Sequence, residues 1–467
     1  MLHHLAATML LVLLPLMMAG RAQAPSGAIR PSAEYPRYWE YKGKPILLLG
    51  GSKEDNLFQI PDLEQHLDLL VASGGNYVRN TLSSRDPGNV WPFAKTNDGL
   101  YDLTKFEPAY WERIERLLTL AAARDIIVQV ELWDRFDFAR EPWQANPYNP
   151  KNNVNYTSQE SGLREEYPKH PGSNENRFFY SVPGRDDNAV LLKYQRAQVE
   201  RFLETALRFP NVLYCMDNET SGDPAWGAYW ARFVRDRARA RGGEVHVTEM
   251  WDAHDLGDPM HRHTLDNPLY TFVEVSQNNH MRDQAHWDNL IAHRTRLGPR
   301  LRPLNNVKIY GADGGRFGET RDGIERFWRN IFGGAASVRF HRPESGIGLS
   351  ELAQRYLKSA RELTARIAIH RTEPAPDLLL DRGPDEAYAL AERGRAYAVY
   401  FTNGGDVRLQ LGGAPGKWRV DWLDAGASVW TPGEVVEGGG PVHLKTPGQG
   451  HWVAVLTAER ATQEGRG

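Results

Sequence analysis

The side chains best suited to chemistry follow an apolar stretch near the middle of the chain. Residues 212–216 read as a buried strand, which changes abruptly to Asp217, Asn218 and Glu219. Apolar residues at helical spacing predict one helix before this strand (194–208) and one after it (225–241). A carboxylate just past the end of a parallel strand stands where α/β barrels keep their catalytic groups. Glu219 is therefore the first catalytic candidate, although an ordinary loop acid is the common alternative.

Polar and aromatic side chains also follow most of the other predicted strands. In a barrel these strand ends would meet at one site, so we expect a functional site there. Several of the acids will nonetheless pair with nearby Arg or Lys side chains for structural reasons alone. Besides Asn218 and Glu219, the candidates are Asn80, Glu131, Trp133, Trp251, Glu274, Lys308, Tyr310 and Asp313.

Carboxylates that face one another between aromatic rings suit glycoside hydrolysis. One acid protonates the leaving oxygen, while the other attacks the anomeric carbon or activates water. The two carboxyl groups lie about 5–5.5 Å apart in retaining enzymes and about 6.5–9.5 Å apart in inverting ones. The sequence predicts a carbohydrate substrate, with Trp133 and Trp251 as sugar-stacking walls. Aromatic side chains are plentiful, but filling a large core is their commoner use.

Other function classes lack their signatures. His261 and His263 have no third ligand at useful spacing, so we predict no metal. A phosphate-binding glycine loop and a Gly-x-Ser-x-Gly elbow are both absent, so no nucleotide cofactor and no serine hydrolase chemistry is expected. The net charge of -3, from 56 basic and 59 acidic residues, includes no basic block and excludes nucleic acid as a partner.

Eight predicted strands alternate with helices over the first three quarters of the chain. This count indicates an α/β fold, a (β/α)₈ TIM barrel, and an open doubly wound sheet is the rival. The polar excursion at 140–187 is long enough to be a functional loop or an ordered cap. The predicted strands span residues 46–49, 76–80, 126–130, 212–216, 245–248, 269–273, 303–310 and 335–340.

The chain divides into three predicted parts. Residues 1–24 read as a signal peptide, because an apolar run ends at the small residues Ala22-Gln-Ala24. Residues 25–372 form the barrel, and 376–458 form a C-terminal antiparallel β-sandwich of short strands separated by Gly/Pro turns. With Cys215 as its single cysteine, the protein fits a bacterial periplasm or cell exterior, with no membrane span after cleavage. The sequence does not indicate an oligomeric state.

The run from Asn211 to Glu219 resembles the strand-four signature of clan A glycoside hydrolases, the cellulase-like (β/α)₈ enzymes. The resemblance implies that Glu219 is the acid/base and that Asn218 binds the sugar hydroxyl beside the scissile bond. A barrel followed by a sandwich, with Tyr400-Phe-Thr-Asn-Gly-Gly405 and Trp418-Arg-Val-Asp-Trp422, also resembles bacterial barrels whose C-terminal domain carries a collagen-binding label. Nothing in the residues supports collagen binding itself.

Strand seven departs from this pattern. Clan A enzymes place a nucleophilic Glu at its end, where this chain has Lys308. A lysine cannot replace that Glu, so the second carboxylate is expected to be Glu274 or, failing that, Asp313. Inversion through a more distant carboxylate is a further possibility. The alternatives are a non-catalytic glycan-binding barrel and a lyase in which Lys308 neutralises a uronate.

Overall fold

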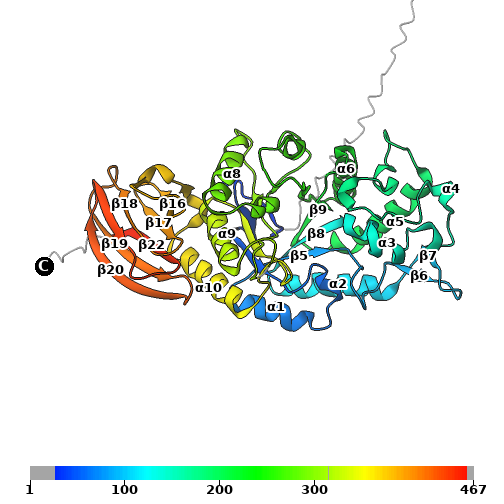
Figure 1. Ribbon diagram of the computed structural model, residues 1–467, viewed down its shortest axis with the longest axis horizontal. Helices are drawn as coiled ribbons and strands as arrows, with labels where there is room; N and C mark the ends of the chain where they lie inside the picture. Colours follow the sequence, from blue (N-terminus) through cyan, green and yellow to red (C-terminus); the bar gives the residue numbers. More distant parts are fainter. Residues whose placement is uncertain (1–26, 314, 460–467) are drawn as a thin grey trace, which may run out of the picture.

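The computed structural model describes residues 27–313 and 315–459. The predicted signal peptide at 1–24 lies outside these residues. Figure 1 shows an elongated molecule with the barrel in the middle and the sandwich strands at one end. Helices α3 (Arg140–Ala145) and α4 (Ser158–Ser161), with the hairpin β6 (Phe93–Lys95) and β7 (Tyr101–Phe106), lie at the opposite end.

The predicted α/β barrel is confirmed. Within the described residues, six parallel strands form one sheet in the order β10-β9-β8-β5-β4-β13, and β11 and β12 form a parallel pair. Backbone hydrogen bonds from Thr271 to Val247 (3.0 Å) and from Ala336 to Leu304 (2.8 Å) join that pair to both edges of the sheet. The strands are β4 (Leu48–Gly51), β5 (Tyr77–Thr81), β8 (Ile127–Asp134), β9 (Val212–Asn218), β10 (Val247–Thr248), β11 (Val273–Glu274), β12 (Leu304–Asn305) and β13 (Ser337–Phe340).

Each central strand is buried along its whole length, as expected for a parallel sheet with both faces covered. The register places chemistry-bearing residues side by side: Trp133 pairs with Asp217, and Asp134 pairs with Asn218. Strands β8 and β9 are therefore in register up to their carboxyl ends. This register fixes Asn218 at the barrel mouth.

Helices cover the outside of the barrel. Their starts follow ordinary capping chemistry: Asp223 accepts a hydrogen bond from the Ala225 amide (2.8 Å), and Pro224 takes the first helical position. The 283–296 helix was not predicted, because its periodicity is weak and its buried face includes His286 and His293. The helices are α1 (Leu63–Ala72), α2 (Pro108–Ala123), α5 (Ala189–Ala206), α6 (Pro224–Ala240), α7 (Arg262–Leu265), α8 (Asp283–Arg296), α9 (Thr320–Phe332) and α10 (Glu351–Arg366).

The polar excursion between β8 and α5 is an ordered cap. It contains α3, α4 and short 3₁₀ turns, which are held together by asparagine amides that donate to backbone carbonyls. Asn149 donates to the Trp143 and Glu165 carbonyls, each at 3.0 Å. Asparagine side chains can satisfy loop backbone groups that no regular element pairs. The excursion therefore has a fixed shape despite its lack of periodicity.

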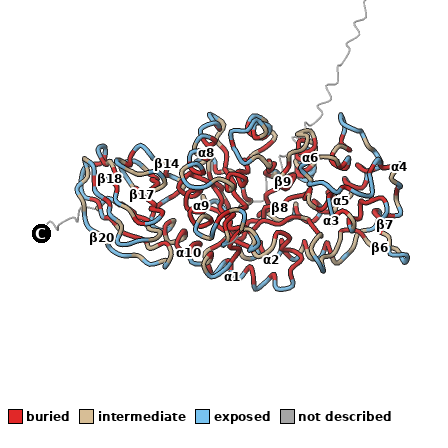
Figure 2. Tube along the Cα trace, in the orientation of Figure 1, coloured by how far each residue is buried: buried red, intermediate tan, exposed pale blue. Residues whose placement is uncertain are grey.

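The C-terminal strands form two antiparallel sheets, with the orders β14-β16-β17-β22-β19-β20 and β15-β18-β21. Buried residues continue from the barrel into this domain, and the edge strand β20 is largely exposed (Figure 2). In β18, exposed residues alternate with buried ones. The strands are β14 (Glu373–Pro374), β15 (Leu379–Leu380), β16 (Ala387–Glu392), β17 (Ala396–Phe401), β18 (Asp406–Gln410), β19 (Lys417–Asp424), β20 (Val429–Glu437), β21 (Pro441–Lys445) and β22 (Trp452–Ala458).

A small antiparallel sheet of β1 (Arg30–Pro31), β2 (Trp39–Tyr41) and β3 (Lys44–Ile46) precedes the barrel. Trp39 donates its indole hydrogen to Asn305 (2.8 Å), at the amino-terminal side of the barrel. A bulky ring at this place closes one end of the barrel interior. Among the described residues, every helix is too short or too polar to cross a membrane.

Candidate functional site at the barrel mouth

Glu219 stands directly after β9 in an unusual backbone conformation. Its φ is 48°, in the left-handed region that costs a non-glycine residue free energy. The following residue, Thr220, is held by a hydrogen bond from its amide to the Met250 carbonyl (2.8 Å). Pairing to the chain beyond β10 thus fixes the turn and directs the Glu219 side chain to the barrel mouth.

One oxygen of the Glu219 carboxylate carries all of its hydrogen bonds within the described residues. Oε1 accepts from the Lys308 ammonium (2.5 Å), the Tyr310 hydroxyl (2.8 Å) and the Gln277 amide (2.9 Å). Oε2 accepts none from that part of the chain, and the side chain is 16% exposed. The carboxylate is therefore oriented through one oxygen, while the other is available to a substrate.

The surroundings of Glu219 keep it ionised. Burial by itself would raise the pKa of Glu219, but the charge of Lys308 and the hydrogen bonds from Lys308 and Tyr310 outweigh it. The result is a pKa well below the usual range for a glutamate. A carboxylate of this kind suits a nucleophile or a base. It does not suit the proton donor that the family resemblance implied for this position.

Lys308 links the two residues of the Asn-Glu pair. Its ammonium donates to Asn218 Oδ1 as well as to Glu219, and its side chain is only 2% exposed. The Asn218 amide in turn donates to Asp134 (3.0 Å). Of the predicted site residues, the structure thus brings Asn218, Lys308 and Tyr310 to Glu219. Their roles toward a substrate stay predictions.

The two carboxylates predicted as partners of Glu219 lie elsewhere. Glu274 is buried in the barrel interior, where it accepts from the Ser276 amide (2.9 Å) and from Gln129 (3.1 Å). Burial raises the pKa of Glu274 to about 7. Asp313 is exposed and accepts from the Thr320 amide (2.9 Å) at the start of α9. Neither shares a hydrogen-bond partner with Glu219 within the described residues.

Trp133 and Trp251 do not form sugar-stacking walls in this structure. Each is 2% exposed, and a ring without exposed faces cannot stack on a sugar. Trp133 packs against Phe178, Trp226 and Trp230 beneath the cap, with ring centroids 5.3–5.7 Å apart. The predicted wall residues are core residues, the commoner use of tryptophan.

Two further candidates are engaged within the protein. Glu131 is fully buried and forms a two-pronged ion pair with Arg79, at 2.7 Å for Nε and 2.5 Å for Nη2. Asn80 is also buried, and its side-chain oxygen accepts from the Phe58 amide (3.0 Å). Both side chains therefore shape the barrel beneath the mouth. Contact with a substrate would require them to leave these partners.

Sequence reasoning missed an aromatic and imidazole group beside the mouth. Tyr310 stacks on Phe317 at 4.3 Å, and the His280 ring meets both of them edge-on at 5.0 and 4.8 Å. His254 stacks face to face on His280 at 3.5 Å and is exposed. These rings come from loops after three different strands. In the sequence, the one signal for these rings as site residues is that they follow the ends of predicted strands.

Asp252 is the other residue that the candidate set omitted. It follows Trp251, which pairs with Thr220 in a parallel bridge, and it lies four residues beyond β10, after the buried Glu249. Its side chain is half-buried. The rule that collects strand-end residues does reach Asp252 after strand five, but the choice among the strand-end acids left it out of the candidate set.

Among the described residues, one group of three acids could hold a metal ion: Asp283, Glu325 and Asp385, with ligand atoms within 4.8 Å of one another. Arg329 already pairs with Asp385 (2.7 Å) and Glu325 (3.3 Å), and Arg321 pairs with Glu325 (2.6 Å). Two guanidinium groups supply the positive charge that a cation would bring. The cluster is therefore an ion-pair network.

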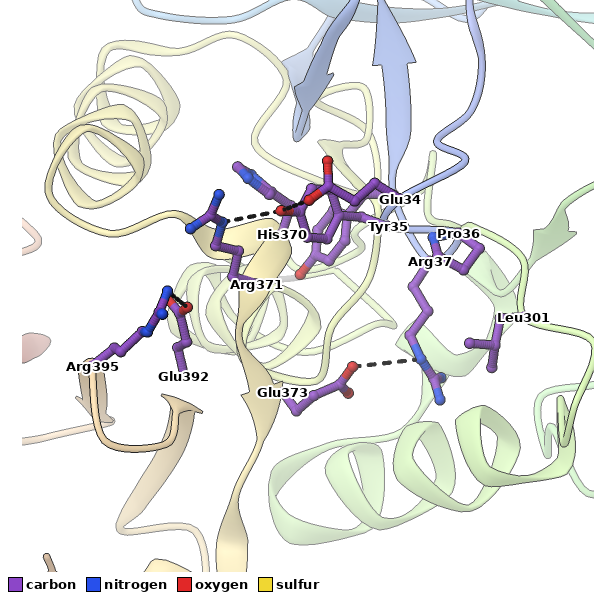
Figure 3. Close-up of a pocket in the computed structure, with 11 residues that line it drawn as sticks. Glu34, Tyr35, Pro36, Arg37, Leu301, His370, Arg371, Glu373, Glu392 and Arg395 are labelled. Carbon is purple, nitrogen blue, oxygen red and sulfur yellow. Dashed lines mark hydrogen bonds and ion pairs between the residues drawn. The ribbon is translucent and has the colours of Figure 1, made fainter. Parts of the chain in front are cut away.

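A cavity of about 560 Å³ lies on the other side of the barrel, where the chain approaches β12. Figure 3 shows Arg37, near Leu301, directed at Glu373, and the Tyr35 ring beside His370, with ring centroids 4.5 Å apart. Barrels keep their chemistry at the carboxyl ends of the strands. This cavity therefore belongs to the junction with the C-terminal domain and not to the Glu219 site.

Comparisons with known proteins agree with this architecture. No protein-family model matches the chain, and no curated protein matches it. Among solved structures, the chain is similar to a family 5 glycoside hydrolase from Bacteroides vulgatus, with 13% identity, a TM-score of 0.65, and 94% of this chain and 95% of that one covered. It is also similar to a family 5 mannosidase from Rhizomucor miehei, with 11% identity, a TM-score of 0.51, and 74% and 99% covered.

A structure described as an alpha-amylase from Geobacillus thermoleovorans, complexed with acarbose, is similar at 11% identity with a TM-score of 0.54, and 92% of this chain and 95% of that one are covered. The fold is thus that of the glycoside hydrolase barrels, as the resemblance predicted. At these identities the comparisons concern the fold alone.

Proposed function

We propose that the protein is a glycoside hydrolase that cleaves O-glycosidic bonds of a polysaccharide or oligosaccharide at the barrel mouth. The observation that carries this proposal is the Glu219 carboxylate, anchored through Oε1 and open at Oε2. An ionised, oriented carboxylate can stabilise or attack an anomeric carbon as positive charge develops there. The glycoside hydrolase barrels that share this fold support the assignment.

The test replaces one carboxylate oxygen of Glu219 with an amide nitrogen and keeps the shape of the side chain. Glu219→Gln is expected to lower hydrolysis by at least about 100-fold, because the neutral amide can neither attack nor act as a base. Purified protein would be screened on cellulose-, mannan- and xylan-derived oligosaccharides, with released reducing ends as the readout. Glu244→Gln, in an exposed loop before β10, is the matched control. Full activity of Glu219→Gln would refute the assignment.

A non-catalytic glycan-binding barrel is the second candidate, because Lys308 occupies the place of the expected nucleophile and pairs with Glu219. Glycan binding in calorimetry, without any turnover by the wild-type protein, would favour it. The lyase alternative requires a free cation for the uronate, and the Lys308 ammonium already donates to Asn218 and Glu219. An unsaturated product would be needed to revive that alternative.

We further propose that the enzyme acts outside the bacterial cytoplasm. The apolar run followed by Ala22-Gln-Ala24 supports export. Fractionation of expressing cells, with the mature amino terminus sequenced, tests this proposal.

A further inference from the structure

A glycoside hydrolase needs a second group that protonates the leaving oxygen, and Glu219 is held in the wrong state for that task. The backbone places one other carboxyl beside it. The Asp252 amide donates to the Thr220 carbonyl (3.0 Å), and the Thr220 amide donates to the Met250 carbonyl (2.8 Å). These bonds hold Asp252 next to the residue that follows Glu219. The two carboxyl-bearing residues thus come from neighbouring strands, at the same level of the barrel mouth.

The Asp252 side chain has no partner among the described residues. Within the described residues it forms neither a hydrogen bond nor an ion pair, although it is only half exposed. Other acids near the carboxyl ends of β8 and β9 are paired: Glu131 with Arg79, Asp134 with Arg85 and Asp217 with Arg135. A half-buried carboxyl without a cation is costly to ionise, so its neutral acid form is favoured.

The pKa of Asp252 is shifted in the opposite direction to that of Glu219. Burial and then the negative charge of Glu219 raise the pKa of Asp252 to about 7, against smaller opposing effects of Lys308 and Arg316. Burial lowers the pKa of the nearby His254, and it lowers the pKa of His280 to about 3, so His280 does not titrate in this range. Two carboxyl groups with pKa values pushed apart are the usual arrangement of an acid and its partner.

We propose that Asp252 is the proton donor to the leaving oxygen and that Glu219 is the ionised partner; this inference rests on the glycoside hydrolase function proposed above. The Asp252 proton passes to the glycosidic oxygen while the bond from that oxygen to the anomeric carbon breaks, so the departing sugar leaves as an alcohol. Glu219 Oε2 either donates an electron pair to the anomeric carbon or removes a proton from the water that does so. In the first case an ester forms between Glu219 and the anomeric carbon. Water later attacks that carbon, releases Glu219 and gives a proton to Asp252.

Glu274 is the natural rival for this role, because its pKa is also raised to about 7. It is 2% exposed, however, and both of its oxygens accept hydrogen bonds inside the barrel, from Ser276 and Gln129. A proton donor has to reach the leaving oxygen at hydrogen-bond distance. Asp252 is half-buried at the mouth, so part of its side chain is exposed and can meet this condition.

The test compares two leaving groups on Asp252→Asn. With a natural oligosaccharide, the variant is expected to lose about 100-fold or more of kcat/KM, the usual contribution of a general acid. With the 2,4-dinitrophenyl glycoside of the same sugar, whose leaving group needs no proton, the loss should stay within about tenfold. The basic limb of the wild-type pH profile, near pH 7, should disappear in the variant. Asp255→Asn, an exposed neighbour, is the matched control.

Equal losses with both leaving groups, or an unchanged basic limb, would overturn the role of Asp252 while leaving the hydrolase function intact. A wild-type protein that hydrolyses no glycoside would overturn the hydrolase function itself. If Asp252→Asn does not fold, a carbon-13 NMR titration of the Asp252→Glu variant and the wild type replaces it. A wild-type carboxyl that titrates near pH 4 instead of near pH 7 would then overturn the inference.

Discussion

At the scale of single residues, the site is governed by the competition between burial and one cation. Burial makes an ionised carboxylate unfavourable, and an ammonium in direct contact reverses that preference. Glu219 has such a contact with Lys308, whereas the nearby Asp252 has none within the described residues. One lysine therefore lowers the pKa of one carboxyl group, while burial keeps the pKa of the other raised. This lysine stands where the resemblance to clan A glycoside hydrolases implies a second carboxylate.

Replacement of this cation tests the argument. In Lys308→Met the pKa of Glu219 should rise by about one to three units, the size of the effect of an adjacent opposite charge. The ionised form is lost as the pH falls through the pKa, so the acid limb of kcat/KM should move to higher pH by a similar amount. Tyr310→Phe, which removes one neutral donor, should shift the limb in the same direction by less. An acid limb that stays in place in Lys308→Met would contradict this account.

At the scale of elements, close packing between α6 and the strand ends positions the turn at Glu219. A Cβ on Gly227 of α6 would overlap Oε2 of the buried Glu249 carboxyl. The other oxygen of that carboxyl accepts from the Asp217 amide (2.8 Å), two residues before Glu219. Glycine is thus required because the helix backbone approaches a side chain that fixes the end of β9.

Gly227→Ala should therefore destabilise the protein by about 1–3 kcal/mol, the usual cost of overpacking a core. Denaturant unfolding with fluorescence detection measures the change. Gly243→Ala is the control, since its Cβ would come no closer than 3.6 Å to another atom, the Ala238 carbonyl oxygen. Equal stability of the two variants would show that α6 can shift away without cost.

The sequence predicted elements better than side-chain directions. All eight barrel strands were anticipated, because a buried parallel strand is an apolar run that ends in polar residues. Their ends also identified Asn218, Glu219, Lys308 and Tyr310 as neighbours. The burial of Trp133 beneath the cap, and of Trp251 against His263 and Thr264, depends in contrast on how loops pack over the strand ends, and one sequence does not encode that plainly. Asp252 was missed in the choice among strand-end acids, since its half-burial is a property of the assembled barrel.

At the scale of the whole molecule, the barrel and the C-terminal domain share a core. One buried cluster contains barrel residues together with Tyr388, Tyr400 and Val455 of the sandwich. Tyr400 stacks on Trp328 of α9, with ring centroids 5.5 Å apart. The second cluster belongs to the sandwich alone and contains Tyr397, three residues earlier on the same strand. Strand β17 therefore presents one face to the barrel and the other to its own domain.

This division predicts different effects for two tyrosines on one strand. Tyr400→Ala and Tyr397→Ala should each cost about 3–5 kcal/mol, the usual range for removing a buried aromatic ring. Only Tyr400→Ala should also accelerate hydrogen exchange of α9, because it removes the ring on which Trp328 packs. Since α9 follows the segment after β12 that carries Lys308 and Tyr310, looser packing of α9 should weaken the hydrogen bonds of these residues to Glu219 and lower kcat/KM as well. Separate calorimetric transitions for the two domains, with α9 exchange unchanged in Tyr400→Ala, would show that the sandwich does not support the barrel.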